Sequence, residues 1–122
     1  MPVSTTFRTF VLDQLGRVAP QIRAKSMFGG VGIYSGNLFF ALIAQDELYL
    51  KVDDSNRPDF EARRIGPFRP YGPDGEAMQY YPLPEEVLED LEALRGWGDK
   101  AIMVARRKKG KRRSKVSNRE HS

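Results

Sequence analysis

Three glycines, at positions 29, 30 and 32, lie close together in the segment SMFGGVGIY, residues 26–34. Glycine-rich loops can bind nucleotide phosphates, because their backbone N–H groups approach the anion closely. A dinucleotide-binding loop, however, leads into a helix, and here an apolar, strand-like segment at 38–44 follows. A P-loop would need Lys-Ser or Lys-Thr after its second glycine, and neither pair follows these glycines. The pattern therefore favours a structural role, such as a bulge, a bend or a close approach between backbones.

The same segment could also form a recognition surface with the residues before it. That surface would comprise Arg23, Lys25, Met27, Phe28, Gly29, Gly30, Gly32 and Tyr34. A pocket beside Tyr34, Phe39 and Tyr49 would suit a small ligand-binding domain or a small enzyme. In the alternative interpretation these aromatic residues fill the core between a sheet and its helices.

Residues that could carry catalysis or bind a metal are scarce in this sequence. The chain has no cysteine, and its one histidine, His121, is second from the carboxyl terminus. A histidine there cannot complete a Ser-His-Asp triad with a folded body. The acidic pairs at 53–54 and 85–86 are typical of helix caps and exposed faces. We therefore expect a protein that is not an enzyme, with no catalytic residue, cofactor or metal site.

Charge divides the chain into two parts. Residues 1–105 contain 11 Lys and Arg against 15 Asp and Glu, whereas residues 106–122 contain nine Lys and Arg against Glu120 alone. The pI of about 9.5 is thus a property of the tail rather than of the body. We expect one domain over residues 1–105 and a basic, disordered tail over residues 106–122, because the tail has almost nothing to bury.

The tail is the part of the sequence best suited to a polyanion. Its cations could release counterions from nucleic acid, which gives an affinity that depends on salt rather than on base sequence. The residues expected to bind nucleic acid are Arg106, Arg107, Lys108, Lys109, Lys111, Arg112, Arg113 and Lys115. The alternative is a terminus that only improves solubility.

Hydrophobic periodicity predicts an α+β fold. A first helix begins after Ser4 or Thr5 and ends before Pro20, with apolar residues spaced three and four apart. Between residues 25 and 52 the period changes to two, which predicts three antiparallel strands in a meander. Its joints, at 35–37 and 45–47, are too short for a parallel crossover.

The second half of the sequence predicts two more helices and a hairpin. A short helix spans 57–64, and a hairpin forms from 68–71 and 77–81 around the turn Gly-Pro-Asp-Gly. A long helix begins at Pro84 and should bend or break at residues 96–98, Gly-Trp-Gly. Trp97 would anchor this helix or, alternatively, contact a partner.

The sequence predicts a cytoplasmic protein without a membrane span. Its amino terminus lacks the basic and apolar regions of a secretory signal, and its longest apolar run, at 38–44, is far shorter than the roughly 20 residues that a span requires.

The motif Met-Phe-Gly-Gly-x-Gly-x-Tyr at 27–34 resembles the amino-terminal domain of the TfoX/Sxy family of bacterial competence regulators. Further agreement comes from Phe39-Phe40-Ala41, from Leu48-Tyr49-Leu50-Lys51 and from residues 84–88, so the resemblance covers about residues 5–108. The order of predicted elements agrees as well.

This resemblance implies a fold like that of type III secretion chaperones and a regulatory role in transcription. In that family the regulator works with the cyclic-AMP receptor protein at promoters, so protein partners in the transcription machinery are expected. This chain has a basic tail where the full regulators carry a second helical domain. Besides a small ligand-binding or enzymatic domain, a further alternative is a dimeric, chaperone-like module that binds a peptide; the chain itself would be a monomer or a homodimer.

Overall fold

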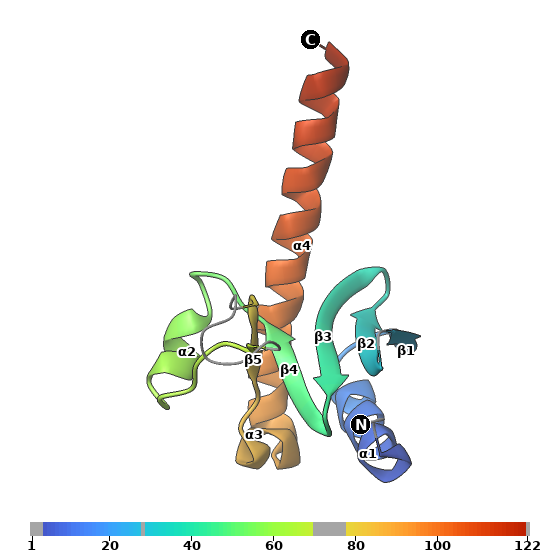
Figure 1. Cartoon of the computed structure of the whole chain (residues 1–122), viewed down its shortest axis with the longest axis vertical. Helices are drawn as coiled ribbons and strands as arrows, with labels where there is room; N and C mark the ends of the chain where they lie inside the picture. Colours follow the sequence, from blue (N-terminus) through green and yellow to red (C-terminus); the bar gives the residue numbers. More distant parts are fainter. Residues whose placement is uncertain (1–3, 28, 70–77, 122) are drawn as a thin grey trace.

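A five-stranded antiparallel sheet lies at the centre of the computed structural model, which describes residues 4–27, 29–69 and 78–121, with side chains up to Gly110. The strands follow one another across the sheet in chain order (Figure 1). They are β1 (Ile22–Met27), β2 (Gly30–Ser35), β3 (Leu38–Ala44), β4 (Glu47–Lys51) and β5 (Tyr80–Pro82). With the helices packed on this sheet, the predicted α+β fold is confirmed.

The meander has one strand more than the sequence predicted. We expected three strands between residues 25 and 52, but the glycine segment follows a tight turn, so that β1 and β2 form a hairpin of their own. Gly29, with φ +79°, lies in that turn, where a residue with a Cβ is strained. The sequence signal was weak because apolar residues on both sides of the turn hide the break between the two strands.

The first helix forms where the sequence predicted it. Helix α1 (Thr5–Val18) is capped by Ser4, whose Oγ accepts a hydrogen bond from the backbone N–H of Phe7. Val11, Leu15 and Val18 are buried against the core, as their spacing predicted. Phe10, expected on the same buried stripe, is 40% exposed instead.

The long carboxyl-terminal helix breaks at a different place from the predicted one. The chain forms α3 (Glu85–Glu89), turns at Asp90 and continues as α4 (Leu91–His121). Asp90 is extended, and its Oδ1 accepts hydrogen bonds from the N–H groups of Glu92 and Ala93, so it caps α4. Helix α4 then passes Gly96-Trp97-Gly98 without interruption, because that stretch is held against the core, with Gly98 buried.

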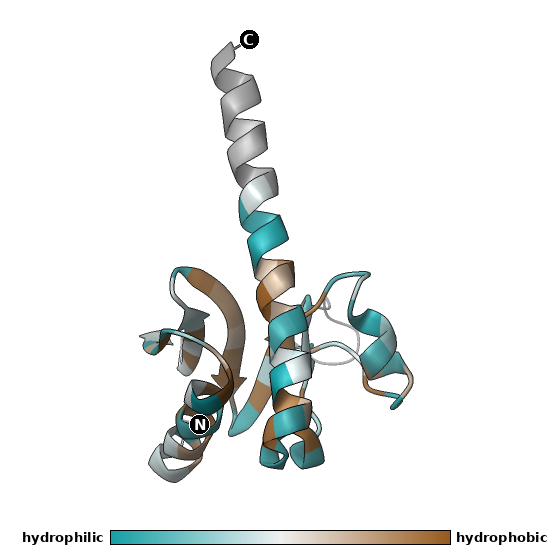
Figure 2. Cartoon of the chain, turned by 180° about the vertical axis from the view of Figure 1, so that it is seen from behind, coloured by the Kyte–Doolittle hydropathy of each residue, from teal (hydrophilic) through white to brown (hydrophobic). Residues whose placement is uncertain are grey.

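Helix α4 supplies one layer of the fold, and the sheet supplies the other. Seen from the side opposite to Figure 1, α4 lies in front of the sheet (Figure 2). Leu94, Ala101 and Val104 of α4 are fully buried, as are Ile33, Phe40, Ile43 and Leu50 of the sheet and Leu15 of α1. Burial of such large side chains is the main stabilising term of the fold.

The backbone of α4 extends far beyond this core. It remains helical to His121, whereas the sequence predicted a disordered tail over residues 106–122. Arg, Lys and Glu are good helix formers, and each added residue prolongs a helix that the core has already nucleated. Residues 106–121 would span about 24 Å at 1.5 Å per residue. In Figure 1 this extension leaves the folded body as a single rod.

The middle of the chain packs beside β4. Helix α2 (Arg57–Glu61) is shorter than the predicted 57–64, and it buries Phe60 against Trp97 of α4, with ring centroids 4.9 Å apart. The backbone N–H of Phe68 donates a hydrogen bond to the carbonyl oxygen of Tyr80 at 2.7 Å, and that of Met78 donates one to the carbonyl oxygen of Phe68 at 2.9 Å, as the predicted hairpin requires. The turn of that hairpin, residues 70–77, lies outside the described residues.

Among the described residues, no helix is long and apolar enough to cross a membrane.

Candidate functional site

The two faces of the sheet carry different side chains. Strand register places Val31 opposite Ile43 and Ile43 opposite Leu48, and all three are buried on the face that α4 covers. The register shifts between Ile33 and Tyr34, and this β-bulge sets Phe39 opposite Tyr34 while its neighbour Phe40 stays in the core. The bulge thus turns an aromatic ring onto the second face of the sheet.

A row of aromatic rings and cations runs across this second face, and we call it the aromatic row. Tyr34 stacks on Phe39 with centroids 5.1 Å apart, and Phe39 contacts Tyr80 at 5.9 Å. The Arg23 guanidinium lies 5.1 Å from the Tyr34 ring, and Lys51 Nζ lies 5.2 Å from Phe39. These rings are half-buried. They therefore neither fill the core between the sheet and its helices nor form a fully exposed recognition surface, and the row is a packed surface layer outside the core.

The pocket beside the glycine hairpin is small. Arg23, Ala24, Lys25 and Tyr34 surround a hollow of about 140 Å³, and Arg23 Nε donates to the Gly36 carbonyl oxygen at 2.9 Å. Typical small-molecule pockets measure roughly 300–1,000 Å³. The arrangement therefore gives little support to a small-ligand site at this position.

The glycines themselves allow close packing between strands. A Cβ on Gly30 would lie 2.5 Å from the Ile43 carbonyl oxygen, and one on Gly32 would lie 2.6 Å from Cε of Met27. Gly30 thus lets two backbones approach each other, as expected for the structural interpretation. Phe28 lies outside the described residues.

The first tail cations differ in their surroundings. Arg106 is exposed, whereas Arg107 binds Asp53 and Ser55, and Lys108 Nζ lies 2.5 Å from Oε1 of Gln79. Arg107 and Lys108 are therefore engaged by the folded body. The side chains of Lys111, Arg112, Arg113 and Lys115 lie outside the described part of the chain.

Asp53 is the acceptor that holds Arg107. Partial burial alone would raise the pKa of Asp53, but hydrogen bonds from Ser55 and Arg107, together with the charge of Arg107, outweigh it and lower the pKa. The carboxylate therefore stays ionised well into the acidic range. Nothing in the sequence links Arg107 to a residue so far away in the chain.

A second hollow, of about 470 Å³, lies where α1, α3 and the start of β4 meet. We call it the acidic groove. Its floor includes Phe7, Phe10 and Leu88, and its rim carries four carboxylates, those of Asp46, Glu47, Glu85 and Glu89. No local sequence pattern indicates this groove, because its residues come from three separate segments.

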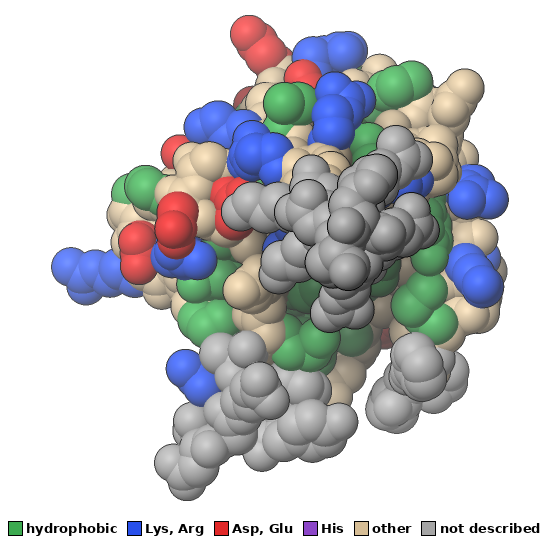
Figure 3. All heavy atoms as spheres, turned by 90° about the horizontal axis from the view of Figure 1, so that it is seen from above, with side chains coloured by type: hydrophobic (Ala, Val, Ile, Leu, Met, Phe, Trp, Pro, Cys, Tyr) green, Lys and Arg blue, Asp and Glu red, His purple; other side chains and the backbone are tan. Residues whose placement is uncertain are grey.

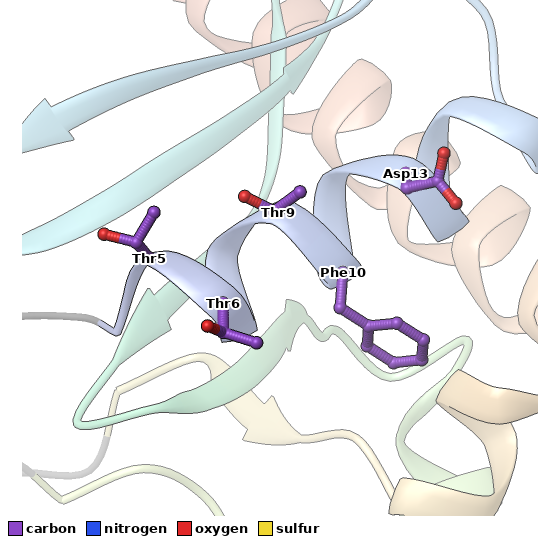
Figure 4. Close-up of a pocket in the computed structure, with 5 residues that line it drawn as sticks. All are labelled: Thr5, Thr6, Thr9, Phe10 and Asp13. Atoms are coloured by element: carbon purple, nitrogen blue, oxygen red, sulfur yellow. The ribbon is translucent and has the colours of Figure 1, made fainter.

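Phe10 also borders a shallow surface depression on α1. Its other residues are Thr5, Thr6, Thr9 and Asp13, all on the same helix (Figure 4). The side chains in Figure 4 point away from the helix in different directions rather than toward one point. Such an arrangement does not assemble a catalytic constellation.

Tyr49 has a strongly raised pKa. Burial, followed by the charge of Glu47 and a 3.3 Å hydrogen bond to its Oε2, raises the pKa of Tyr49 to about 12. The hydroxyl therefore stays protonated at neutral pH and is no general base there. Among the described residues, no group of three His, Asp or Glu side chains could hold a metal ion.

The end of the molecule from which α4 extends carries charges of both signs. Figure 3 looks onto this end, where Lys and Arg side chains are spread around the view with apolar side chains between them, and Asp and Glu side chains lie at its left and top.

Comparison with protein families identifies a relationship over most of the chain. The family model described as TfoX N-terminal domain matches residues 13–105. The matched range includes the aromatic row and most of the acidic groove, and it ends directly before the basic tail. No curated protein matches the chain.

Proposed function

Because this chain belongs to the TfoX N-terminal domain family, we propose that it is a regulatory domain that acts through protein contacts rather than catalysis. We further propose that the basic end of α4 adds a nonspecific affinity for nucleic acid. The transcription machinery is the partner class that the family resemblance implies.

The observation that carries the nucleic-acid part is the separation of charge between the body of the chain and the end of α4. Residues 1–105 are net acidic, and the nine Lys and Arg of residues 106–122 belong to a helix that extends beyond the body. A helix presents its cations at regular intervals along one rod, which suits the repeating phosphates of a duplex. The acidic body would repel that duplex, so binding is confined to the extension.

Fluorescence anisotropy of a labelled duplex DNA tests this proposal at about 50 and about 200 mM salt. Each phosphate contact contributes about 0.9 to the slope of log affinity against log salt. In the full chain, Arg112→Gln with Arg113→Gln should therefore reduce the slope by about two. A matched control replaces two exposed body cations, Lys25→Gln with Arg64→Gln, and should leave the slope unchanged.

Equal effects of the tail pair and the body pair would contradict the assignment of binding to the tail. Absence of salt-sensitive binding would remove the nucleic-acid part altogether. The non-catalytic part is tested by a thermal-shift screen of small ligands, since a ligand that binds the native state raises Tm. A ligand whose effect disappears in Tyr34→Ala would support the small-ligand alternative instead.

A further inference from the structure

We propose that the acidic groove docks a partner segment in which Lys or Arg side chains alternate with apolar ones, as in a cationic amphipathic helix. This inference rests on the proposed role in protein contacts and gives that partner a chemistry.

The floor of the groove supplies apolar contact area. Phe10 is 40% exposed on α1, although helix spacing places it next to the buried stripe, and Phe7 beside it is half-buried. Figure 4 shows the Phe10 ring standing away from α1. An aromatic ring beside a hollow of about 470 Å³ is the kind of feature on which binding energy concentrates. The floor thus favours an occupant with apolar side chains.

The rim supplies carboxylates that take part in none of the ion pairs found among the described residues. The ion pairs recorded among the described residues use Asp13, Asp53, Asp54, Asp59 and Glu86. None of them involves Asp46, Glu47, Glu85 or Glu89, and no Lys or Arg lines the groove. Asp46 accepts a hydrogen bond from the Ser4 backbone, and Glu47 accepts one from Tyr49. Four carboxylates around one hollow favour a cationic occupant and repel nucleic acid.

The chain's own tail satisfies only one of these two requirements. Residues 106–122 carry nine cations, but Val116 is their only large apolar residue. A tail from a second copy would therefore neutralise the rim and leave Phe7 and Phe10 without apolar contacts. The floor and the rim together select a different segment, one with apolar anchors between its cations.

Fluorescence anisotropy with designed peptides tests this inference on the full chain. The probe is a labelled peptide with leucines along one helix face and lysines along the other. One control peptide replaces the lysines by glutamates, a second replaces the leucines by serines, and a third has the sequence of residues 106–122. We expect the Leu/Lys probe to bind, and the Leu/Glu and Ser/Lys peptides to bind at least about tenfold more weakly.

Variants of the chain locate the binding. Glu85→Gln with Glu89→Gln should weaken binding of the probe about fivefold, and Phe10→Ala should weaken it by a similar factor. The matched controls are Glu92→Gln, an exposed acid outside the groove, and Met103→Ala, an apolar side chain that is 42% exposed on α4. Neither control should change the affinity. Circular dichroism melts verify that each variant is folded.

Three results would overturn the inference. The first is no binding of the Leu/Lys probe, and the second is equal binding of the probe by the groove variants and their controls. The third is binding of the 106–122 peptide as tightly as the probe, which would assign the groove to a second copy. The DNA experiment uses a different segment and a different ligand. If the probe does not bind the groove, the nucleic-acid part of the proposed function is unaffected. If the chain does not bind DNA, the groove inference is unaffected.

Discussion

Arg107 of α4 binds Asp53, which follows β4, through its Nη2 atom, 3.1 Å from Oδ2 and 3.3 Å from Oδ1 of the carboxylate. The same nitrogen lies 2.6 Å from Oγ of Ser55. This contact joins the first turn of the basic extension to the folded body.

Removing this ion pair should destabilise the fold slightly. Arg107→Gln should lower the free energy of unfolding by about 0.5–1 kcal/mol, because the two side chains are 42% and 29% exposed and solvent screens their attraction. Urea unfolding followed by Trp97 fluorescence measures the change. Arg106→Gln removes a neighbouring cation that pairs with no carboxylate in the described part of the chain, and it should have no effect. An equal loss in both variants would contradict the assignment.

The Asp53 contribution should disappear in acid. The folded-state pKa of Asp53 is lowered, so its stabilising effect is fully present above the unfolded-state pKa of about 3.9 and is lost as pH falls through the lower, folded-state pKa. The difference in unfolding free energy between the wild type and Asp53→Asn should therefore be constant from pH 5 to pH 7 and shrink below about pH 4. A difference that does not depend on pH would refute this role of the carboxylate.

Tyr49 should make the protein less stable in alkali. Its folded-state pKa is raised from 10.0 to about 12, so the folded state retains a proton that the unfolded state releases. The resulting stabilisation is fully present below pH 10 and is lost as pH rises toward 12. Ultraviolet titration of phenolate should show one late-titrating tyrosine, which Tyr49→Phe removes and Glu47→Gln shifts to lower pH. If the late titration persisted in Tyr49→Phe, the assignment would fail.

Two glycine substitutions should change stability in opposite directions. Gly30→Ala places a methyl group 2.5 Å from a backbone carbonyl oxygen that cannot easily move, and it should cost about 1–3 kcal/mol. Gly16 lies on α1, and a Cβ added there would meet no atom within 4 Å beyond the helix's own backbone. Gly16→Ala should therefore add about 0.5–1 kcal/mol to the free energy of unfolding through better helix propensity. Thermal unfolding of both variants measures the contrast. A neutral Gly30→Ala would show that the strands can separate at that point.

Local signals were enough to predict most helices and strands. The Ser4 cap and the spacing of Val11, Leu15 and Val18 each reflect a few neighbouring residues, and the structure confirms them. The alternation in 48–52 predicted a strand that does form, as β4, although Tyr49 is buried together with Leu48 and Leu50. The failures came where tertiary contacts decide. Packing against the core carries α4 through Gly96 and Gly98, and the capping side chain of Asp90 places the break earlier.

The candidate site was less predictable than the fold, for the same physical reason. Helix periodicity brings Phe10 to the edge of the buried stripe, but only the position of α3 determines that its ring borders a groove rather than a core. Likewise, the composition of the tail predicted cations, yet it could not show that Arg107 binds Asp53. Contacts between residues far apart in the chain carry no local pattern that a single sequence reveals.

The strand order of the sheet has a kinetic consequence. From β1 to β4 each strand pairs with the next strand in the chain, across connections of two residues, so these hairpins close at little entropic cost. Pairing of β4 with β5 must instead close the segment 52–79, and α1 must find α4 from the other end of the chain. We expect the four-strand meander to form first during refolding and the β5 edge to join later. Pulse-labelling hydrogen exchange would show this as early protection of the Ile43 amide and late protection of the Tyr81 amide, and simultaneous protection of both would refute the order.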